Sequence, residues 1–590
     1  MTENNPYRTI IDIAKHCSIA IVGAYICAQF IIYAALPYWK WNSAYLLFGI
    51  FVLTNGCEIV KEKKLFLYRT IFISLFLMMP IFIGILANQP LHMEVQYRTI
   101  GFSLAVAASF FFLQALLPVN KFRKIFSCIF YSIIFLLFAI LCGYYFSSGS
   151  LLNASAIMAV FQTNPAEARS YLIDYMPWQG CCVIFLFFTM YIVYLHQWNP
   201  LITVEWKDRY HSRYQVIAIV VCVILTIVSL YPSRNNFYKN LFIETQKGLK
   251  AYRTFTLSRE EHSEAIQNQL IGISSDNPGV YILVIGESQN RLHMSAYGYE
   301  KETTPWLNKM KDDKHAVLFT DARSCHTHTV PVLSYALTDK NQYNQKDLPN
   351  ALTLIEVAKA AGFHTVWLSN QVRYGAWDTP TAVIADEADE QVWLNNHMGN
   401  TTDTSVFDGD LVGCLKQSQV TTKTLIVIHL MGNHSDYRDR YPHDFSFFDD
   451  YSIEGFYDNS IRYNDFVVQS IYETVKTIPN FQGMVYCADH ADDVERNLGH
   501  DSSHFTQDMT RIPFYMLFSD DYIEHHYNIL QELRVHKDSR FTNDLLYNTM
   551  LGIMGIIVPA DYEEQNDLTN KNYDTDKERF RTLHGKEKLD

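Results

Sequence analysis

Two apolar stretches in the second half of the chain each end in residue types that bind metal ions. Residues 281–285 run into Glu287, and residues 483–487 run into Asp489 and His490. Carboxylate oxygens and imidazole nitrogens are both good zinc ligands. A glutamate after a buried strand is usually a helix cap or a surface charge, so the Asp489–His490 pair is the more specific signal. The two positions together predict a metal site.

A group of hydroxyl-bearing residues lies between these two positions. Thr327 and Thr329 stand in a stretch with two histidines, directly before Pro331 and an apolar run that is typical of a helix start. A threonine at this place can simply cap the helix. Its hydroxyl is also well placed to attack a phosphate that the backbone N–H groups at a helix N-terminus hold. The sequence leaves both interpretations open.

Two further histidines complete the set of candidate residues. His434 lies in a loop with glycine and asparagine that follows residues 425–428, and His500 lies a little beyond His490. A histidine near a strand end is commonly structural, but loops of this kind often carry function. All the candidates fall near a predicted strand end or on the loop after it, and this shared placement is more informative than any single residue.

The elements that must position these residues follow an alternating pattern across residues 279–560. Strands are predicted at 279–285, 316–320, 364–368, 424–430, 483–487 and 512–518, and helices at 350–361 and 459–477. Such alternation indicates an α/β domain with a mostly parallel central sheet covered on both faces. Open α/β sheets bind their substrates at the carboxyl ends of the strands. Residues 561–590 are charged, and we expect a poorly ordered tail.

Residues 1–231 have a different character, because they contain long apolar runs. Segments that are apolar enough to span a membrane lie at 17–37, 43–59, 66–88, 100–118, 124–147, 179–196 and 215–231. Basic residues gather before the first of these spans and in every second loop, so the N-terminus is expected in the cytoplasm and the second half outside. Residues 232–278 are expected to form a partly helical linker at the membrane surface.

Charge and cysteine content argue against several classes of protein. The net charge of −13 argues against nucleic acid as a partner, because binding phosphates requires a basic face. The second half contains only Cys325, Cys414 and Cys487, which allow at most one disulfide bridge.

A sensor or transporter would carry ionisable residues within several spans, and these spans contain almost none.

The sequence resembles the phosphoethanolamine transferases of Gram-negative inner membranes, which belong to the alkaline phosphatase and sulfatase superfamily. The resemblance covers most of the chain, and the branch that modifies the lipopolysaccharide core is more similar than the lipid A branch. The motifs that carry it are residues 284–288, 291–295, 297–299, 303–305, 367–371, 429–432, 457–463, 489–490 and 499–500, and residues 163–168 in an outer loop.

The resemblance implies the roles of the metal-binding residues. A zinc ion is expected on Glu287, Asp489, His490 and the nucleophile. The nucleophile is expected to be Thr329, with Thr327 as the alternative because the spacing from the threonines to the following proline differs from that in the lipid A enzymes.

The resemblance also implies residues that bind the substrate. His434 and His500 match two histidines that hold the transferred phosphate, and Thr163 and Glu167 match positions at the lipid head group. The chain departs from the family at an asparagine expected before Thr163 and at a serine and a lysine expected near residues 370–373. Family members usually have five spans, whereas seven are predicted here.

The activity that the resemblance implies is transfer of phosphoethanolamine from phosphatidylethanolamine to a cell-envelope acceptor through a covalent threonine intermediate. The expected acceptor is lipopolysaccharide core or lipid A. The expected location is the bacterial inner membrane, with several spans in the lipid bilayer and a periplasmic catalytic domain, and we expect a monomer. A phosphoglycerol transferase or a sulfatase would share Glu287, Asp489 and His490, so this alternative stays open.

Overall fold

The computed structural model describes residues 62–117, 120–162, 169, 176–197, 236–260, 264–371, 380–395, 406–448, 451–559 and 562–590. The chain divides into two compact units, which are residues 1–154 with 174–246 and residues 155–173 with 247–590. Three predicted spans, 17–37, 43–59 and 215–231, lie outside the described residues. Thr163 and Glu167 lie outside them as well.

The described part of the first unit consists of helices joined by short turns and irregular segments. Its helices are α3 (Lys63–Leu77), α4 (Met79–Leu86), α5 (Met93–Leu116), α6 (Asn120–Ser148) and α9 (Trp178–Gln197). Among the described residues, one helix, Lys121–Ser148, is long and apolar enough to cross a membrane by itself. The pair α3 and α4 passes the same test together but is bent by 44°, where Pro80 in the first turn of α4 lacks the N–H that would continue the helix. The prediction of seven spans therefore stays a prediction.

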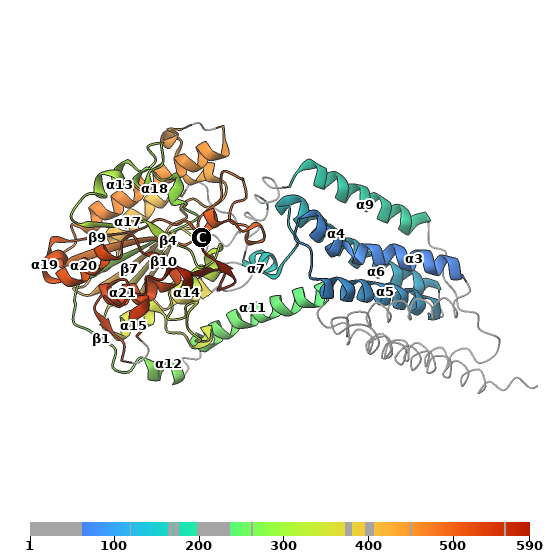
Figure 1. Ribbon diagram of the computed structural model, residues 1–590, viewed down its shortest axis with the longest axis horizontal. Helices are drawn as coiled ribbons and strands as arrows, with labels where there is room; N and C mark the ends of the chain where they lie inside the picture. Colours follow the sequence, from blue (N-terminus) through green and yellow to red (C-terminus); the bar gives the residue numbers. More distant parts are fainter. Residues whose placement is uncertain are drawn as a thin grey trace, which may run out of the picture. The chain divides into compact units, whose positions relative to one another are not determined.

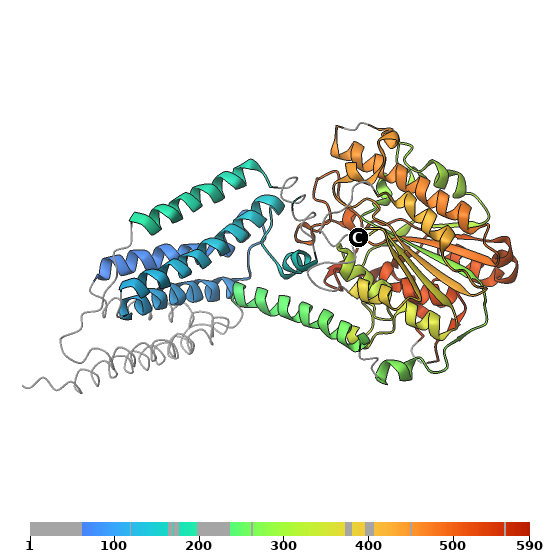
Figure 2. The ribbon, with the colours of Figure 1, turned by 180° about the vertical axis from the view of Figure 1, so that it is seen from behind.

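The second unit is built on a seven-stranded sheet (Figures 1 and 2). The strands, in spatial order, are β3 (Ala316–Phe319), β9 (Phe514–Phe518), β8 (Phe481–Ala488), β2 (Val280–Gly286), β7 (Thr424–His429), β5 (His364–Ser369) and β6 (Glu390–Trp393). Within this sheet β9 runs in the direction opposite to the other six strands. The mostly parallel sheet and all six predicted strands are confirmed. Strand β6 was not predicted, because this edge strand is only half-buried and four residues long.

The central strands fix which side chains meet at the carboxyl edge of the sheet. All residues of β2 and β8 are buried, which agrees with their continuous apolar sequences. Ile285 of β2 pairs with His429 of β7 on one side and with Cys487 of β8 on the other. This register brings the residues after β2, β7 and β8 to the same place.

Helices cover both faces of the sheet (Figures 1 and 2). One face carries α13 (Pro305–Met310), α17 (Leu411–Gln417) and α18 (Ile453–Val475), and the other carries α14 (Thr329–Ala336), α15 (Leu354–Ala360) and α21 (Leu546–Ile553). The two predicted helices are confirmed as α15 and α18. Helix α15 begins where Thr353 and Glu356 form a capping box.

Further α-helices and short strands lie in the described part of the chain. Two of these helices, α11 (Phe237–Glu260) and α12 (Glu264–Gln269), lie in the predicted linker. The remaining elements are α7 (Ala154–Gln162), α11 (Phe237–Glu260), α12 (Glu264–Gln269), α16 (Pro380–Asp386), α19 (Asp520–His525), α20 (Tyr527–Val535), β1 (Ser274–Ser275), β4 (Asp321–Arg323), β10 (Arg540–Thr542), β11 (Ile556–Ile557), β12 (Arg581–Thr582) and β13 (Glu587–Lys588).

The prediction of a poorly ordered tail is wrong for residues 562–590. Strands β12 and β13 pair as an antiparallel hairpin, and the last side chain, Asp590, forms ion pairs with Arg323 at 2.9 Å and Arg511 at 3.0 Å. The apolar residues of this segment that are buried in the domain core are Leu568, Tyr573, Phe580 and Leu589. The charges that suggested disorder are thus paired with residues far away in the sequence.

Candidate active site

Four side chains converge at the carboxyl edge of the sheet. His490 Nε2 lies 3.2 Å from Glu287 Oε1 and 3.5 Å from Asp489 Oδ2. Thr329 is the first residue of α14, and its hydroxyl donates a hydrogen bond of 3.0 Å to Glu287 Oε2. The Thr329 oxygen is also 3.4 Å from His490 Nε2. The structure therefore brings together the four residues that the sequence proposed as zinc ligands.

Ser288 fixes the two carboxylates relative to each other. Its backbone N–H donates to Asp489 Oδ1 at 3.1 Å, and its hydroxyl donates to Glu287 Oε1 at 2.9 Å. Its φ of +53° lies in the left-handed region, which is unfavourable for a residue other than glycine. No role was predicted for Ser288, although it stands in a Gly-Glu-Ser sequence directly after a buried strand.

The loop after β7 packs directly against the end of β2. The N–H of Asn433 donates to the carbonyl oxygen of Glu287 at 2.9 Å. A Cβ on Gly432, whose φ is +53°, would lie 2.8 Å from the backbone N and O of Glu287. The buried Asp408 carboxylate holds this loop by accepting the N–H groups of Met431 and Gly432, both at 2.8 Å. Sequence reasoning missed Asp408, because no local pattern connects it with a loop more than twenty residues away.

Gln371 makes a further contact with the glutamate. Its side-chain Nε2 donates to Glu287 Oε2 at 3.3 Å and to the carbonyl oxygen of Leu430 at 2.8 Å. It therefore ties the end of β5 to the carboxylate and to the loop after β7.

The charges of this cluster fit a bound cation. Burial raises the pKa of Glu287. Burial and the neighbouring Glu287 charge raise the pKa of Asp489 to about 7. Asp489 Oδ2 is buried and accepts no hydrogen bond from any described residue. Two buried carboxylates, an imidazole and a hydroxyl are a donor set that zinc accepts, and a divalent cation would offset the repulsion between the carboxylates.

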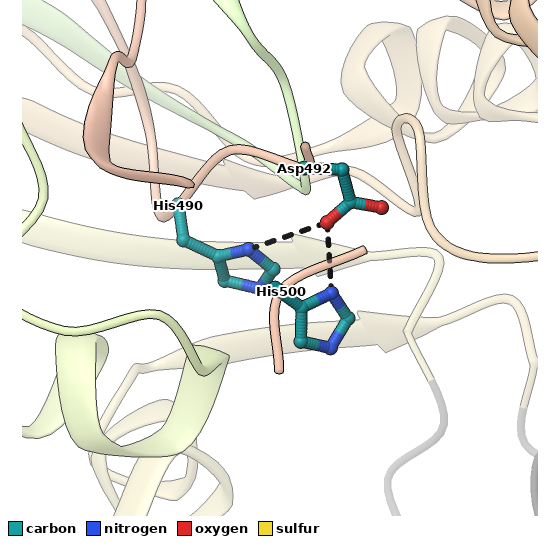
Figure 3. A group of neighbouring side chains, drawn as sticks. All are labelled: His490, Asp492 and His500. Carbon is teal, nitrogen blue, oxygen red and sulfur yellow. Dashed lines mark hydrogen bonds and ion pairs between the residues drawn. The ribbon is translucent and has the colours of Figure 1, made fainter. Parts of the chain in front are cut away.

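A second group contains His490, Asp492 and His500 (Figure 3). Asp492 Oδ1 lies 2.8 Å from His500 Nδ1 and 3.9 Å from His490 Nδ1. Its other oxygen accepts a hydrogen bond of 2.6 Å from the Tyr437 hydroxyl. Burial lowers the pKa of His500, but the charge and hydrogen bond of Asp492, together with the charges of Glu287 and Asp489, outweigh burial and raise this pKa to about 9. Asp492 therefore orients His500 and favours its protonated form.

The remaining predicted residues take different positions. His434 is held neutral, because burial and then the charges of Arg440 and His500 lower its pKa to about 3. Thr327 is buried, and its hydroxyl has no hydrogen-bond partner in the described part of the chain. The structure thus brings Thr329, and not Thr327, to the carboxylates.

Known proteins resemble the chain in sequence and in fold. The Sulfatase family matches residues 280–556. Phosphoethanolamine transferase EptC of Escherichia coli K12 is 28% identical over 65% of this chain and 72% of its own. Phosphoethanolamine transferase CptA of Salmonella typhimurium is 24% identical over 73% of this chain and 80% of its own.

A solved structure extends the likeness to both units. It is the integral membrane protein lipooligosaccharide phosphoethanolamine transferase A from Neisseria meningitidis, and it covers 85% of this chain and 97% of its own with a TM-score of 0.56. At 17% identity, this likeness shows a shared fold. Residues 280–556 therefore match the Sulfatase family, and the chain is similar to phosphoethanolamine transferases, the resemblance that its motifs indicated.

Proposed function

We propose that the chain is a membrane-anchored transferase that moves phosphoethanolamine from phosphatidylethanolamine to lipopolysaccharide core or lipid A. The observation that carries this proposal is the position of Thr329. This residue begins a helix, and its hydroxyl donates to a carboxylate within a cluster of side chains that could hold a metal ion. A hydroxyl in this position can act as a nucleophile toward phosphorus. The names of the relatives supply the identity of the transferred group.

The cluster of Glu287, Asp489, His490 and Thr329 would hold a zinc ion. A zinc ion held there would lower the pKa of the threonine hydroxyl and offset negative charge on the phosphate oxygens. The Asp489 Oδ2 atom, which accepts no hydrogen bond from a described residue, and the raised pKa values of both carboxylates support this assignment.

In the first step, Thr329 Oγ1 attacks the phosphorus of phosphatidylethanolamine. Glu287 Oε2, which already accepts the hydrogen bond of this hydroxyl, is the nearest base to its proton. The bond from phosphorus to the diacylglycerol oxygen breaks, and the protonated His500 gives its proton to this leaving oxygen. Diacylglycerol departs, and phosphoethanolamine remains as an ester of Thr329.

In the second step, an acceptor hydroxyl or phosphate displaces Thr329 from the phosphorus. A hydroxyl acceptor gives its proton to the neutral His500, whereas with a phosphate acceptor His500 takes its proton from solvent. In both cases Thr329 recovers its own proton from Glu287. His434, neutral because of its low pKa, donates a hydrogen bond to a phosphate oxygen in both steps. From the family motif alone, we assign Thr163 and Glu167 to the lipid head group.

A membrane anchor suits this scheme, because the donor lipid need not leave the bilayer. The apolar helix α6 supports such an anchor. The distribution of basic residues in the sequence supports several spans, with the catalytic domain on the periplasmic side of the inner membrane.

The adduct on Thr329 is the experimental test. The purified chain is incubated in detergent with phosphatidylethanolamine that carries an isotope label in its head group, and peptides are analysed by mass spectrometry. We expect labelled phosphoethanolamine on Thr329 in the wild type and in Thr327→Ala, and none in Thr329→Ala. An adduct on Thr327, or none in the wild type, would contradict the proposal. Mass spectrometry of lipopolysaccharide from cells with and without the gene then identifies the acceptor.

A further inference from the structure

The hairpin of residues 581–590 lies beyond the part of the chain that matches the Sulfatase family. It contacts the segment that leads to the nucleophile. The Thr582 hydroxyl donates to the carbonyl oxygen of Ser324 at 2.8 Å, and the N–H of His584 donates to the carbonyl oxygen of Cys325 at 3.1 Å. The hairpin is therefore fixed to the backbone just before Thr329.

The same hairpin contacts the helix that Thr329 begins. His584 Nε2 lies 3.1 Å from the carbonyl oxygen of Pro331, in the first turn of α14. The His584 ring also stacks on Tyr335, one turn further along, with ring centres 3.9 Å apart and planes 3° apart. A carbonyl oxygen only accepts hydrogen bonds, so Nε2 must carry the proton in this contact. Residues 581–590 thus bind the chain on both sides of Thr329.

The start of α14 lacks the usual support of a helix N-terminus. Its N-cap residue is His328, and no side-chain capping hydrogen bond is present among the described residues. Pro331 removes one backbone donor from the first turn, and the helix has only eight residues. An external contact is therefore well suited to fix the position of this turn.

The hairpin is itself rigidly held. Gln342 accepts the N–H of Gly585 at 2.8 Å and donates to the carbonyl oxygen of Arg581 at 2.9 Å. Leu583 and His584 adopt φ values of +50° and +54°, which are rare for side-chain-bearing residues and require support from surrounding contacts. These contacts and the ion pairs of Asp590 with two arginines hold the hairpin in one position. The hairpin can therefore fix the position of the first turn of α14.

We propose that His584 is a positioning residue, which fixes the first turn of α14 and so holds the Thr329 hydroxyl against Glu287. The His584 side chain acts through the Pro331 carbonyl and the Tyr335 ring and does not itself touch the substrate. The effect on rate rests on the proposed transferase function, whereas the effect on the order of the helix start does not.

Two substitutions at His584 separate the hydrogen bond from the ring. His584→Phe keeps a ring that can stack on Tyr335 but removes the donor, and His584→Gln keeps an amide donor near the position of Nε2. Lys586→Ala, at an exposed site in the same hairpin, is the matched control. For each variant, we would measure kcat and KM for adduct formation, zinc content, thermal midpoint and amide hydrogen exchange of residues 329–336.

Loss of the His584 hydrogen-bond donor should affect only the rate of adduct formation and the order of the first turn of α14. Because misplacement of a nucleophile by about 1 Å can cost roughly 100-fold, a smaller displacement in His584→Phe should lower kcat about tenfold at unchanged KM. Amide exchange at the start of α14 should become faster in this variant. His584→Gln should stay within about threefold of the wild-type kcat. Zinc content and thermal midpoint should match those of Lys586→Ala.

Three results would overturn the inference: a wild-type kcat in His584→Phe, a kcat in His584→Gln as low as in His584→Phe, or a loss of rate that parallels a loss of zinc or of thermal stability. If the wild type forms no adduct, the proposed function fails, and hydrogen exchange alone decides. Faster exchange in His584→Phe but not in His584→Gln then supports the positioning contact, and unchanged exchange refutes it.

Discussion

Replacement of Gly432 by alanine tests how the loop after β7 positions the end of β2. The new Cβ would lie 2.8 Å from both the backbone N and the backbone O of Glu287, closer than such atoms approach in folded proteins. Glu287 cannot easily move away, because β2 is paired on both sides and its carbonyl oxygen accepts the N–H of Asn433. The φ of +53° at Gly432 adds a conformational penalty for any residue with a side chain.

The expected loss of stability combines these two effects. A left-handed conformation costs about 1–2 kcal/mol for an L-residue, and overpacking in a buried site costs about 1–3 kcal/mol. Gly432→Ala should therefore lower the free energy of unfolding by about 2–5 kcal/mol. Because the overlap falls on Glu287, the displacement should also weaken metal binding and slow adduct formation.

The assay compares Gly432→Ala with Gly413→Ala in α17, where an added Cβ meets no atom within 4 Å. Thermal midpoint, zinc per chain and rate of adduct formation are measured for both variants. The control should keep its zinc and activity, and alanine in a helix should stabilise it by about 0.5–1 kcal/mol. A Gly432→Ala variant with the zinc content and midpoint of the wild type would refute the packing argument.

Three further predictions follow from the charged groups. Asp492→Asn removes the carboxylate that contributes most to raising the pKa of His500 to about 9, so the basic limb of the pH–kcat/KM profile should move to lower pH by at least about one unit. An unmoved limb would exclude His500 as the proton donor. Burial raises the pKa of Asp465 to about 7, so the folded protein binds a proton at this carboxyl more tightly than the unfolded chain does. The free energy of unfolding therefore falls by up to about 4 kcal/mol as the pH rises from about 4 to 7. The thermal midpoint of Asp465→Asn should therefore exceed that of the wild type by more at pH 8 than at pH 5. An equal difference between the two midpoints at both pH values would contradict this. Chelation should remove zinc and activity together, and zinc affinity should weaken as pH falls below 7, since protons compete for Asp489; affinity independent of pH by calorimetry would exclude Asp489 as a ligand.

The strands and the cluster of candidate metal ligands were predictable because local sequence determines them. The apolar runs before Glu287 and Asp489 are long enough to specify buried strands, and strands of a parallel sheet end at the same edge. The convergence of Glu287 with Asp489 and His490 follows from these two facts. Pro331 likewise marks the start of α14 in the sequence.

Residues that act through long-range contacts were not predictable from local patterns. Asp408 holds the loop at Gly432 from a separate part of the chain. Residues 581–590 suggested disorder because of their charge, but composition does not show where the partners of those charges lie. Arg323 and Arg511, which bind Asp590, come from elements more than seventy residues away. Only the three-dimensional structure brings these groups together.

The choice between the two threonines shows how a local change of backbone conformation determines the candidate nucleophile. Alternate side chains of an extended segment lie on the same face, so an extended backbone would direct both hydroxyls to one side. The backbone is extended at His328 and becomes helical at Thr329. The Thr327 hydroxyl consequently lies buried, while the Thr329 hydroxyl reaches Glu287. The residue at which α14 begins therefore decides which hydroxyl meets the carboxylates, so the contacts that fix this helix start also determine the geometry of the candidate site.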